Sequence, residues 1–341
     1  MMNELVDFFR NKDVLVTGGC GSIGSAIVEQ LLNYDVKRIR VFDSNESAQF
    51  HLQERLAAYG KVRSLIGDIR EKERLKRAMK GVNIVFHCAA LKHVPMCEYN
   101  PFEAVATNVH GTENVVDAAR AEGVDKFMAI STDKAVNPIN TMGATKLLSE
   151  KLVMTASVGE VKTLFSCVRL GNVLNSSGSV VPTFMEQIKN GGPVKVTSKD
   201  MVRFFITMSE AVDLILTDTL KMEGREIFIL KMKALRVIDL AEVMVEELAP
   251  RYGHKPKDVE LKIVGVRPGE RLYELLMNEE EAEHAIDEGH EFVLRPGLYT
   301  PHYISEGAST SPIDPKHYDA RKADLLTKNG IRKLLQDNKI L

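Results

Sequence analysis

A short apolar run followed by three closely spaced glycines constrains this chain more than any other feature. Residues 13–17 predict a buried strand, and apolar residues recur at helical spacing from Ser25 onward. The glycines between the two segments are Gly18, Gly21 and Gly24. In such a unit they permit a tight turn, a close approach of backbone N–H groups to a pyrophosphate, and close packing of helix on sheet. The turn predicts a dinucleotide site at a helix N-terminus, with Ser22 and Ile23 beside the anion.

A carboxylate follows the next predicted strand. Residues 38–42 form a second apolar run, and Asp43 comes directly after it, about twenty residues beyond the glycines. A carboxylate at this spacing accepts hydrogen bonds from the ribose hydroxyls of adenosine and repels a 2′-phosphate. The sequence therefore favours NAD over NADP, with the nearby Arg40 leaving NADP open.

Two further strand ends are expected to contact the cofactor. Asp68 and Ile69 follow the run at residues 62–66. Asp68 suits an adenine amino group, and it also suits the N-cap of a helix over residues 71–79. The small-residue loop after the strand at residues 82–88 is predicted to lie along the cofactor, and a side chain in the next helix is predicted to brace backbone there. The residues concerned are Ala89, Ala90, Lys92 and Asn108.

Strand and helix patterns alternate through the first half of the chain, up to a strand at residues 126–131. This order predicts an α/β fold, a Rossmann-like doubly wound parallel sheet with ligands bound at the carboxyl ends of the strands. The alternation becomes irregular beyond Asn172. We expect an NAD-binding domain over residues 1–172, completed by about 206–232, and a smaller C-terminal substrate-binding lobe over 173–205 and 233–341.

Charge and cysteine usage exclude several classes of protein. The 341 residues carry a formal net charge of −2 with both signs interspersed, so we expect no nucleic-acid partner. No run of about eighteen apolar residues is present, so no membrane insertion is expected. The cysteines lack metal-ligand or disulfide-framework spacing, which predicts no metal site and a reducing cytoplasm. They are Cys20, Cys88, Cys97 and Cys167.

Several segments together resemble the extended short-chain dehydrogenase/reductase superfamily and, within it, the 4,6-dehydratases that act on UDP-N-acetylglucosamine. The segments are Thr17–Gly24, Ser131–Ala135, Met142–Lys146, Arg169–Leu174, Ser176–Pro182, Met201–Phe205 and Val266–Glu270. They span nearly the whole chain. One departure is residues 230–234, Leu-Lys-Met-Lys-Ala, where an acidic and glycine-containing stretch is expected.

The other departure is Met142, which stands where the family commonly carries a catalytic tyrosine, although a subgroup shares the methionine. Met142 and Lys146 lie four residues apart, on one face of a helix predicted to begin near Gly143. A thioether cannot donate or accept a proton. Proton transfer is therefore expected to fall to neighbouring residues at the strand end, Asp133 and Lys134, unless those two form a solvated loop pair.

The resemblance implies an internal redox cycle. NAD⁺ takes a hydride from sugar C4, water is lost across C5 and C6, and the hydride returns to C6. The product would be a UDP-4-keto-6-deoxy-N-acetylhexosamine for bacterial surface glycans. Oxidation at C4 acidifies the C5 proton, and the C6 hydroxyl needs a proton in order to leave.

The resemblance also assigns roles to residues. Asp133 is the expected acid at C6 and Lys134 the expected base at C5. Thr132 would bond the C4 hydroxyl, and Lys146 would hold the nicotinamide ribose. The expected substrate contacts are Lys92, His93, Asn172, Ser179, Val180, Arg203, Arg267 and Glu270, with a surface ion pair as the alternative for the two arginines.

Two other functions are considered. A 4-epimerase of the same fold needs a tyrosine base at position 142, and a non-catalytic NAD-sensing regulator has no use for Asp133 and Lys134. The sequence leaves open the C5 stereochemistry and the choice between uridine and guanosine diphosphate. By resemblance, a homo-oligomer is expected.

Overall fold

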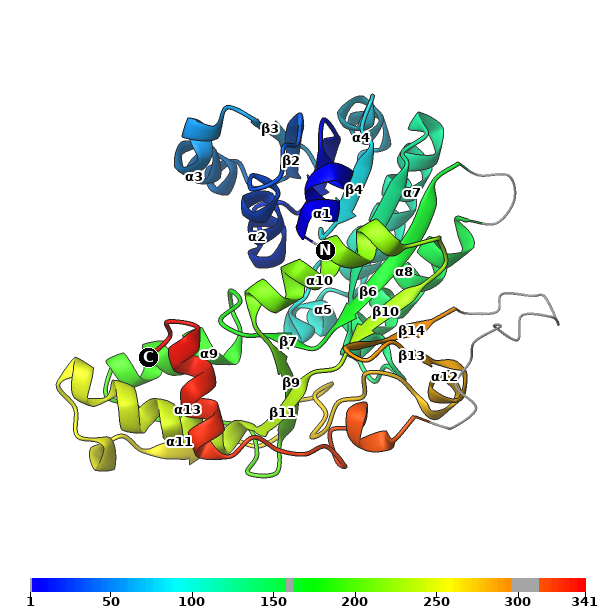
Figure 1. Ribbon diagram of the computed structural model, residues 1–341. Coiled ribbons are helices and arrows are strands. Elements are labelled where there is room, and N and C mark those ends of the chain that lie inside the picture. Colours follow the sequence, from blue (N-terminus) through cyan, green and yellow to red (C-terminus); the bar gives the residue numbers. More distant parts are fainter. Residues whose placement is uncertain (1, 158–161, 296–312) are drawn as a thin grey trace.

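The computed structural model describes residues 2–157, 162–295 and 313–341 (Figure 1). Within these ranges the main sheet has nine strands in the order β13-β14-β10-β6-β5-β4-β1-β2-β3. Their bounds are β1 Asp13–Thr17, β2 Arg38–Asp43, β3 Val62–Ile66, β4 Ile84–His87, β5 Lys126–Thr132, β6 Leu164–Leu170, β10 Ile227–Leu230, β13 Ile286–Asp287 and β14 Glu291–Leu294. All neighbouring pairs from β3 to β10 are parallel. The predicted Rossmann-like parallel sheet is confirmed.

Side chains of the central strands alternate between two apolar layers. Val14 and Val16 of β1 lie in one layer and Leu15 in the other, as the two-residue period of a strand requires. The first layer is covered by α1 (Met2–Phe9), α2 (Ser22–Leu31), α3 (Glu46–Leu56) and α10 (Met208–Lys221). The second is covered by α4 (Lys72–Met79), α7 (Gly111–Glu122) and α8 (Thr141–Thr155). Burial on both faces fixes the strand ends that carry the site.

The alternating pattern predicts one helix over residues 101–122, but in the structure this helix is interrupted. It consists of α6 (Pro101–Ala104), a π-helical turn (Val105–His110) and α7, and it follows the short helix α5 (Val94–Tyr99). The wider turn carries Asn108. Its side-chain Oδ1 accepts from the N–H of Leu91 at 2.8 Å, and its Nδ2 donates to the carbonyl of Leu91 at 3.0 Å. Asn108 thus braces the loop after β4, as expected.

The smaller lobe is built on β9 (Val202–Ile206), which lies between β7 (Asn172–Val173) and β11 (Lys233–Arg236). A parallel pair, β8 (Val194–Val196) and β12 (Leu261–Ile263), lies beside it. One apolar cluster joins three helices that Figure 1 shows packed together near the C-terminus: α9 (Val180–Lys189), α11 (Val237–Leu248) and α13 (Lys328–Asp337).

One part of the expected lobe belongs to the main sheet instead. Helix α12 (Glu279–His284) leads into β13 and β14, and β14 pairs antiparallel with β10. The sequence places residues 286–294 in the lobe, because two short strands carry no βα alternation to mark them as part of the main sheet. The boundary of the lobe is corrected accordingly.

Candidate active site

The glycine turn has the close contacts that exclude larger residues. Gly18 has a φ of +62°, and a Cβ there would lie 2.7 Å from the backbone of Ala89. A Cβ on Gly24 would lie 2.3 Å from the carbonyl oxygen of Gly18. Helix α2 begins at Ser22 rather than near Ser25, so Gly24 lies inside its first turn. The turn therefore brings the helix N-terminus against the end of β1.

A cleft of about 720 Å³ crosses the carboxyl ends of β1, β2, β4 and β5. All the expected cofactor residues except Asn108, which lies behind it, line this cofactor cleft. They are Gly18, Gly21, Ser22, Ile23, Gly24, Asp43, Asp68, Ile69, Ala89, Ala90, Lys92 and Lys146. The glycines line the middle of the cleft, and the carboxylates of Asp43 and Asp68 lie at the ends of β2 and β3.

The two carboxylates of the cleft are held in different ways. Asp43 accepts hydrogen bonds from the backbone N–H groups of Cys20 and Asn45, both at 3.0 Å. Asp68 pairs with Arg70 at 2.6 Å, and this lowers the pKa of Asp68. The N-cap of α4 is Glu71, so the interpretation of Asp68 as that cap is wrong.

Helix α8 carries a row of three side chains toward the end of β5. Asn140 caps it by accepting from the N–H of Gly143 at 2.7 Å, so the helix begins at Thr141. The buried Met142 lines the cofactor cleft and packs in a small apolar cluster. Lys146 donates to the carbonyl of Ile130 at 2.6 Å, and burial lowers its pKa. Both side chains lie at the strand end, as predicted.

The third member of the row, Glu150, was missed by the sequence analysis. It accepts from Ser131 at 2.5 Å and from the buried guanidinium of Arg169 at 2.8 and 3.1 Å. Arg169 also donates to Glu281 at 3.0 Å. This network fixes α8 to β5 and β6. Only the four-residue spacing after Lys146 could have indicated Glu150.

The half-buried Lys134 and the buried Asp133 form a pair in a 3-10 turn (Asp133–Ala135) directly after β5. Lys134 Nζ lies 2.8 Å from Asp133 Oδ1, which also accepts from Thr132 at 2.9 Å. Asp133 is 0% exposed, so the interpretation as a solvated loop pair is wrong. Thr132 and Lys134 line the cofactor cleft, whereas Asp133 lies behind them. Burial alone would lower the pKa of Lys134. The negative charges of Asp133 and Glu274 outweigh the effect of burial, so the pKa of Lys134 is raised.

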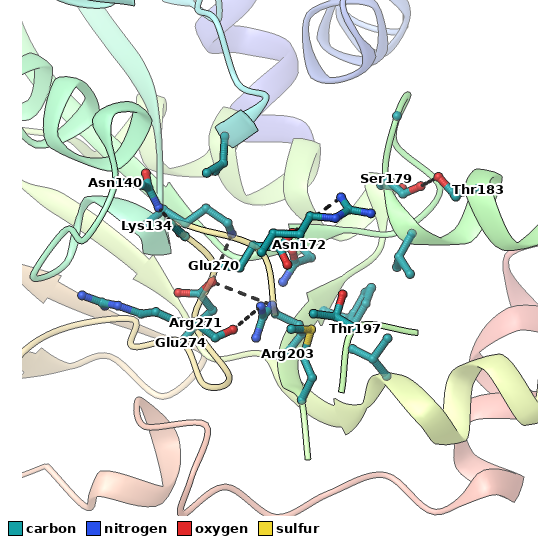
Figure 2. Close-up of a pocket in the computed structure, with 18 of the residues that line it drawn as sticks. Lys134, Asn140, Asn172, Ser179, Thr183, Thr197, Arg203, Glu270, Arg271 and Glu274 are labelled. Atoms are coloured by element: carbon teal, nitrogen blue, oxygen red, sulfur yellow. Dashed lines mark hydrogen bonds and ion pairs between the residues drawn. The ribbon is translucent and has the colours of Figure 1, made fainter. Parts of the chain in front are cut away.

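A second cleft of about 280 Å³ opens into the smaller lobe (Figure 2). Of the expected substrate residues it is lined by Asn172, Ser179, Val180, Arg203, Arg267 and Glu270. Lys92 and His93 line the cofactor cleft instead. Lys134, Asn172, Gly178 and Ser179 line both clefts, so Lys134 lies at their junction.

The arginines of this substrate cleft differ in what holds them. Arg203 is buried and donates to the carbonyls of Arg271 at 2.6 Å and Leu272 at 3.0 Å. The surface-ion-pair interpretation is therefore wrong for Arg203. Nη1 of the exposed Arg267 lies 3.8 Å from Oε1 of Glu270, so the surface ion pair considered as the alternative is present for Arg267.

A helix N-terminus also faces the substrate cleft. Ser179 is the N-cap residue of α9 but makes no side-chain cap, so the first N–H groups of the helix are available to an anion. The preceding loop contacts the other domain: the N–H of Ser177 donates to Ser22 at 2.9 Å, and Lys92 donates to the carbonyl of Ser177 at 2.6 Å. This loop thus lies between the two clefts.

Sequence reasoning missed several residues that line the substrate cleft: Asn140, Thr183, Lys195, Thr197, Arg271 and Glu274. Asn140 joins the two halves of the site, because its amide also donates to the carbonyl of Gly269 at 2.8 Å. Asn140 lies just before a predicted helix, and this position was the sequence signal that could have identified it. Thr183 lies on α9 and Lys195 on β8, whereas Thr197, Arg271 and Glu274 lie on segments outside the helices and strands.

Comparisons with known proteins agree with this geometry. A family model described as "Polysaccharide biosynthesis protein" matches residues 14–296. The chain is 52% identical to a Methanocaldococcus jannaschii protein named "Uncharacterized membrane protein MJ1061", over 99% of both chains. It is 40% identical to the UDP-N-acetylglucosamine 4,6-dehydratase (inverting) of Campylobacter jejuni, over 85% of this chain and 84% of that protein. The UDP-glucose 4-epimerase of Rickettsia bellii is also 40% identical, over 82% of each chain.

A solved structure is similar over almost its full length. The X-ray structure of Pen from Bacillus thuringiensis matches with a TM-score of 0.91 and 39% identity, covering 98% of this chain and 99% of that one. Fold and site together define an extended short-chain dehydrogenase/reductase. The chain belongs to the polysaccharide biosynthesis protein family, and its relatives include proteins named as nucleotide-sugar dehydratases and epimerases. In the described ranges, no helix is long and apolar enough to cross a membrane.

Proposed function

We propose that this protein is a nucleotide-sugar 4,6-dehydratase that converts UDP-N-acetylglucosamine to a UDP-4-keto-6-deoxy-N-acetylhexosamine, for surface glycan biosynthesis in the cytoplasm. The observation that carries the proposal is the place of Lys134. It lies where the cofactor and substrate clefts meet, paired with a buried carboxylate, while the residue at position 142 cannot exchange a proton. A dehydratase needs these extra proton-transfer groups beyond hydride transfer.

The cofactor cleft fits NAD. The glycine turn leaves room for a pyrophosphate against the N-terminus of α2, and the fixed carboxylate of Asp43 suits ribose hydroxyls and disfavours a 2′-phosphate. Bound there, NAD supplies a hydride acceptor for C4 and the hydride that C6 receives. Lys146, beside the end of β5, would orient the nicotinamide ribose.

The chain's own residues account for the protons. Thr132 would hydrogen-bond the C4 hydroxyl, and Lys134 as the free amine would take the C5 proton. The resulting ammonium, after exchange with solvent, would return a proton to C5 when the hydride reaches C6. The C6 hydroxyl leaves as water with a proton from Asp133. Because Asp133 is buried behind Thr132 and Lys134, its proton reaches C6 along their hydrogen bonds or by a small side-chain movement. The C4 hydroxyl proton passes to Asp133 or Lys134, through Thr132 or water.

The substrate cleft supplies the groups for a nucleoside diphosphate. The N-terminus of α9 at Ser179 and Val180 would hold phosphate oxygens, together with the amide of Asn172 and the exposed guanidinium of Arg267. Glu270 would accept from the nucleoside ribose. Arg203 would act mainly by shaping the wall, because backbone carbonyls occupy its donors.

The alternative is a 4-epimerase, which the similarity to the Rickettsia bellii protein favours. Epimerisation also begins with oxidation at C4, but it involves no elimination and has no use for a base at C5. Met142 counts against it, because the C4 hydroxyl would lack the tyrosine that this chemistry uses.

The test is to incubate the purified protein with UDP-N-acetylglucosamine in deuterated water, without added cofactor, and to follow the sugar by NMR and mass spectrometry. We expect loss of one water with deuterium at C5, and the ring couplings then report the C5 stereochemistry. Lys134→Ala should lose turnover and keep its bound NAD. A sugar changed only at C4 would establish the epimerase, and an intact sugar would move the test to the guanosine analogue.

A further inference from the structure

Glu274 is a buried carboxylate at the substrate cleft to which the reaction above gives no role. It is 3% exposed and lines the cleft beside Lys134. Figure 2 shows Lys134, Arg203 and Glu274 converging in this pocket, with Glu274 Oε1 3.7 Å from Lys134 Nζ and 3.8 Å from Arg203 Nε. Its other oxygen, Oε2, is buried and has no hydrogen-bond partner among the described residues. A buried carboxylate oxygen without a partner is costly, which is typical of a functional site.

The frame around Glu274 is rigid. Its carbonyl oxygen accepts from the N–H of Ala320 at 3.1 Å, and Leu275 forms an antiparallel bridge with Asp319. Arg203 donates to the carbonyls of residues 271 and 272 in the same segment. The carboxylate is therefore presented to Lys134 by fixed backbone rather than by a mobile loop side chain.

Charged groups face this carboxylate from three segments. Lys134 and Asp133 come from the turn after β5, Arg203 from β9, and Arg271 from the segment of Glu274 itself. Burial, with Asp133, raises the pKa of Glu274, and the three cations oppose that shift. Lys134 in turn has a carboxylate on each side, at 2.8 Å and 3.7 Å.

We propose that Glu274 is a positioning residue for Lys134, which fixes the place of Nζ at the junction of the clefts and favours its ammonium form in the free enzyme. The inference rests on the proposed function, because it concerns the group assigned as the C5 base. Lys134 must lose its resting proton before it can accept one from C5. Glu274 and Asp133 together then set the pH above which the free amine is available.

The first experiment measures Lys134 directly, without turnover. The protein is labelled with ¹³C at lysine Cε, and the Lys134 signal is assigned by its absence from Lys134→Ala. In the wild type we expect this lysine to titrate above about 10.4, the value of an unperturbed lysine. In Glu274→Gln the titration should move down by about 1–3 pH units, the usual effect of an opposite charge within about 4–6 Å.

The matched control is Glu270→Gln. It removes a carboxylate from the same cleft, but the ion-pair partner of Glu270 is Arg267 rather than Lys134. It should raise KM and leave the Lys134 titration in place. If Glu274→Gln does not fold, Glu274→Asp keeps the charge but draws it away from Nζ, and a smaller downward shift is expected.

The second readout is the pH dependence of kcat. Its acid limb should move to lower pH in Glu274→Gln by the same amount as the NMR titration, and Glu274→Asp should restore most of the wild-type position. The inference would be overturned if Lys134 of the wild type titrated below the ordinary lysine value. It would also be overturned if neither the acid limb of kcat nor the Lys134 titration moved in Glu274→Gln. A rise in KM alone would overturn it as well, because that indicates direct substrate contact.

The two readouts separate this inference from the proposed function. A shifted titration in a protein that never releases a dehydrated sugar refutes the dehydratase and leaves the coupling of Glu274 to Lys134 established. A dehydratase with an unshifted Lys134 refutes only the coupling.

Discussion

In the proposed reaction, Met142 would contribute shape to the site rather than proton transfer. Its side chain lines the cofactor cleft and packs with Cys97, Ala104 and Val94. Leucine is nearly isosteric, and such exchanges in a packed environment usually cost less than about 1.5 kcal/mol. We therefore expect Met142→Leu to keep kcat within about tenfold of the wild type.

The measurement is the rate of water loss from UDP-N-acetylglucosamine, with bound NAD and thermal unfolding as controls for folding. A Met142→Leu protein that is folded, holds NAD and no longer eliminates water would contradict a packing role. Lys134→Ala provides the reference for a lost proton-transfer group.

For single residues, the sequence could predict which side chains lie together because of their spacing, but it could not predict which side chains are buried. Met142 and Lys146 are four apart, and this alone placed them together at the end of β5. For Asp133, expected as the acid, the sequence also left a solvated loop pair open, because the groups that bury it are distant in sequence. Glu274, which faces it across Lys134, comes from a segment with no helical or strand period.

The contact between α10 and β14 carries a buried acidic pair. Asp218 is 0% exposed and lies 3.2 Å from Lys221, which also pairs with Glu291. Burial, followed by the charge of Glu291, raises the pKa of Asp218 to about 9. The unfolded value is about 3.9, so the folded state binds a proton that the unfolded state releases. Its contribution to stability is fully present below about pH 4 and is lost as pH rises toward about 9.

Asp218→Asn should remove this pH dependence, because the amide resembles the protonated acid. We expect the melting temperature of the variant to exceed that of the wild type by about 2–5 °C at pH 8 and by much less at pH 5, measured by circular dichroism. The exposed Glu223→Gln, just beyond the same helix, should change neither value. A variant less stable than the wild type at pH 8 would show that Asp218 is ionised in the folded protein.

Among the helices and strands, the buried parallel strands could be predicted from the sequence, whereas the strands at the β13 end of the sheet could not. A strand such as β1 is apolar along its whole length and buried on both faces. In contrast, β13 and β14 are short, and the pairing of β14 with β10 joins residues more than fifty positions apart in the sequence. The π-helical turn before α7 also left no local sign, because its role is the tertiary contact of Asn108 with Leu91.

For the whole molecule, the Rossmann-like parallel sheet followed from the sequence, whereas the way the smaller lobe meets the sheet did not. The predicted site residues fell into two clefts rather than one. What joins the clefts is a set of single contacts between distant segments, such as Asn140 with Gly269 and Lys92 with Ser177. Contacts of that kind have no periodic pattern, so only the assembled fold displays them.

The expected homo-oligomer has a candidate surface on the helices beside α8. Tyr99 and Phe102 are 87% and 88% exposed, and Met96 and Leu148 are exposed nearby on α5 and α8, which contact each other. Exposed apolar groups that cluster on adjacent helices are typical of an interface, and a twofold dimer would set this patch against its copy in a second chain. The double variant Tyr99→Asp, Phe102→Asp should therefore convert the oligomer to monomers in light scattering at micromolar concentration. Phe50→Asp, which places the same charge on the distant α3, should keep the wild-type mass, and a wild type that is itself monomeric would remove the basis of the prediction.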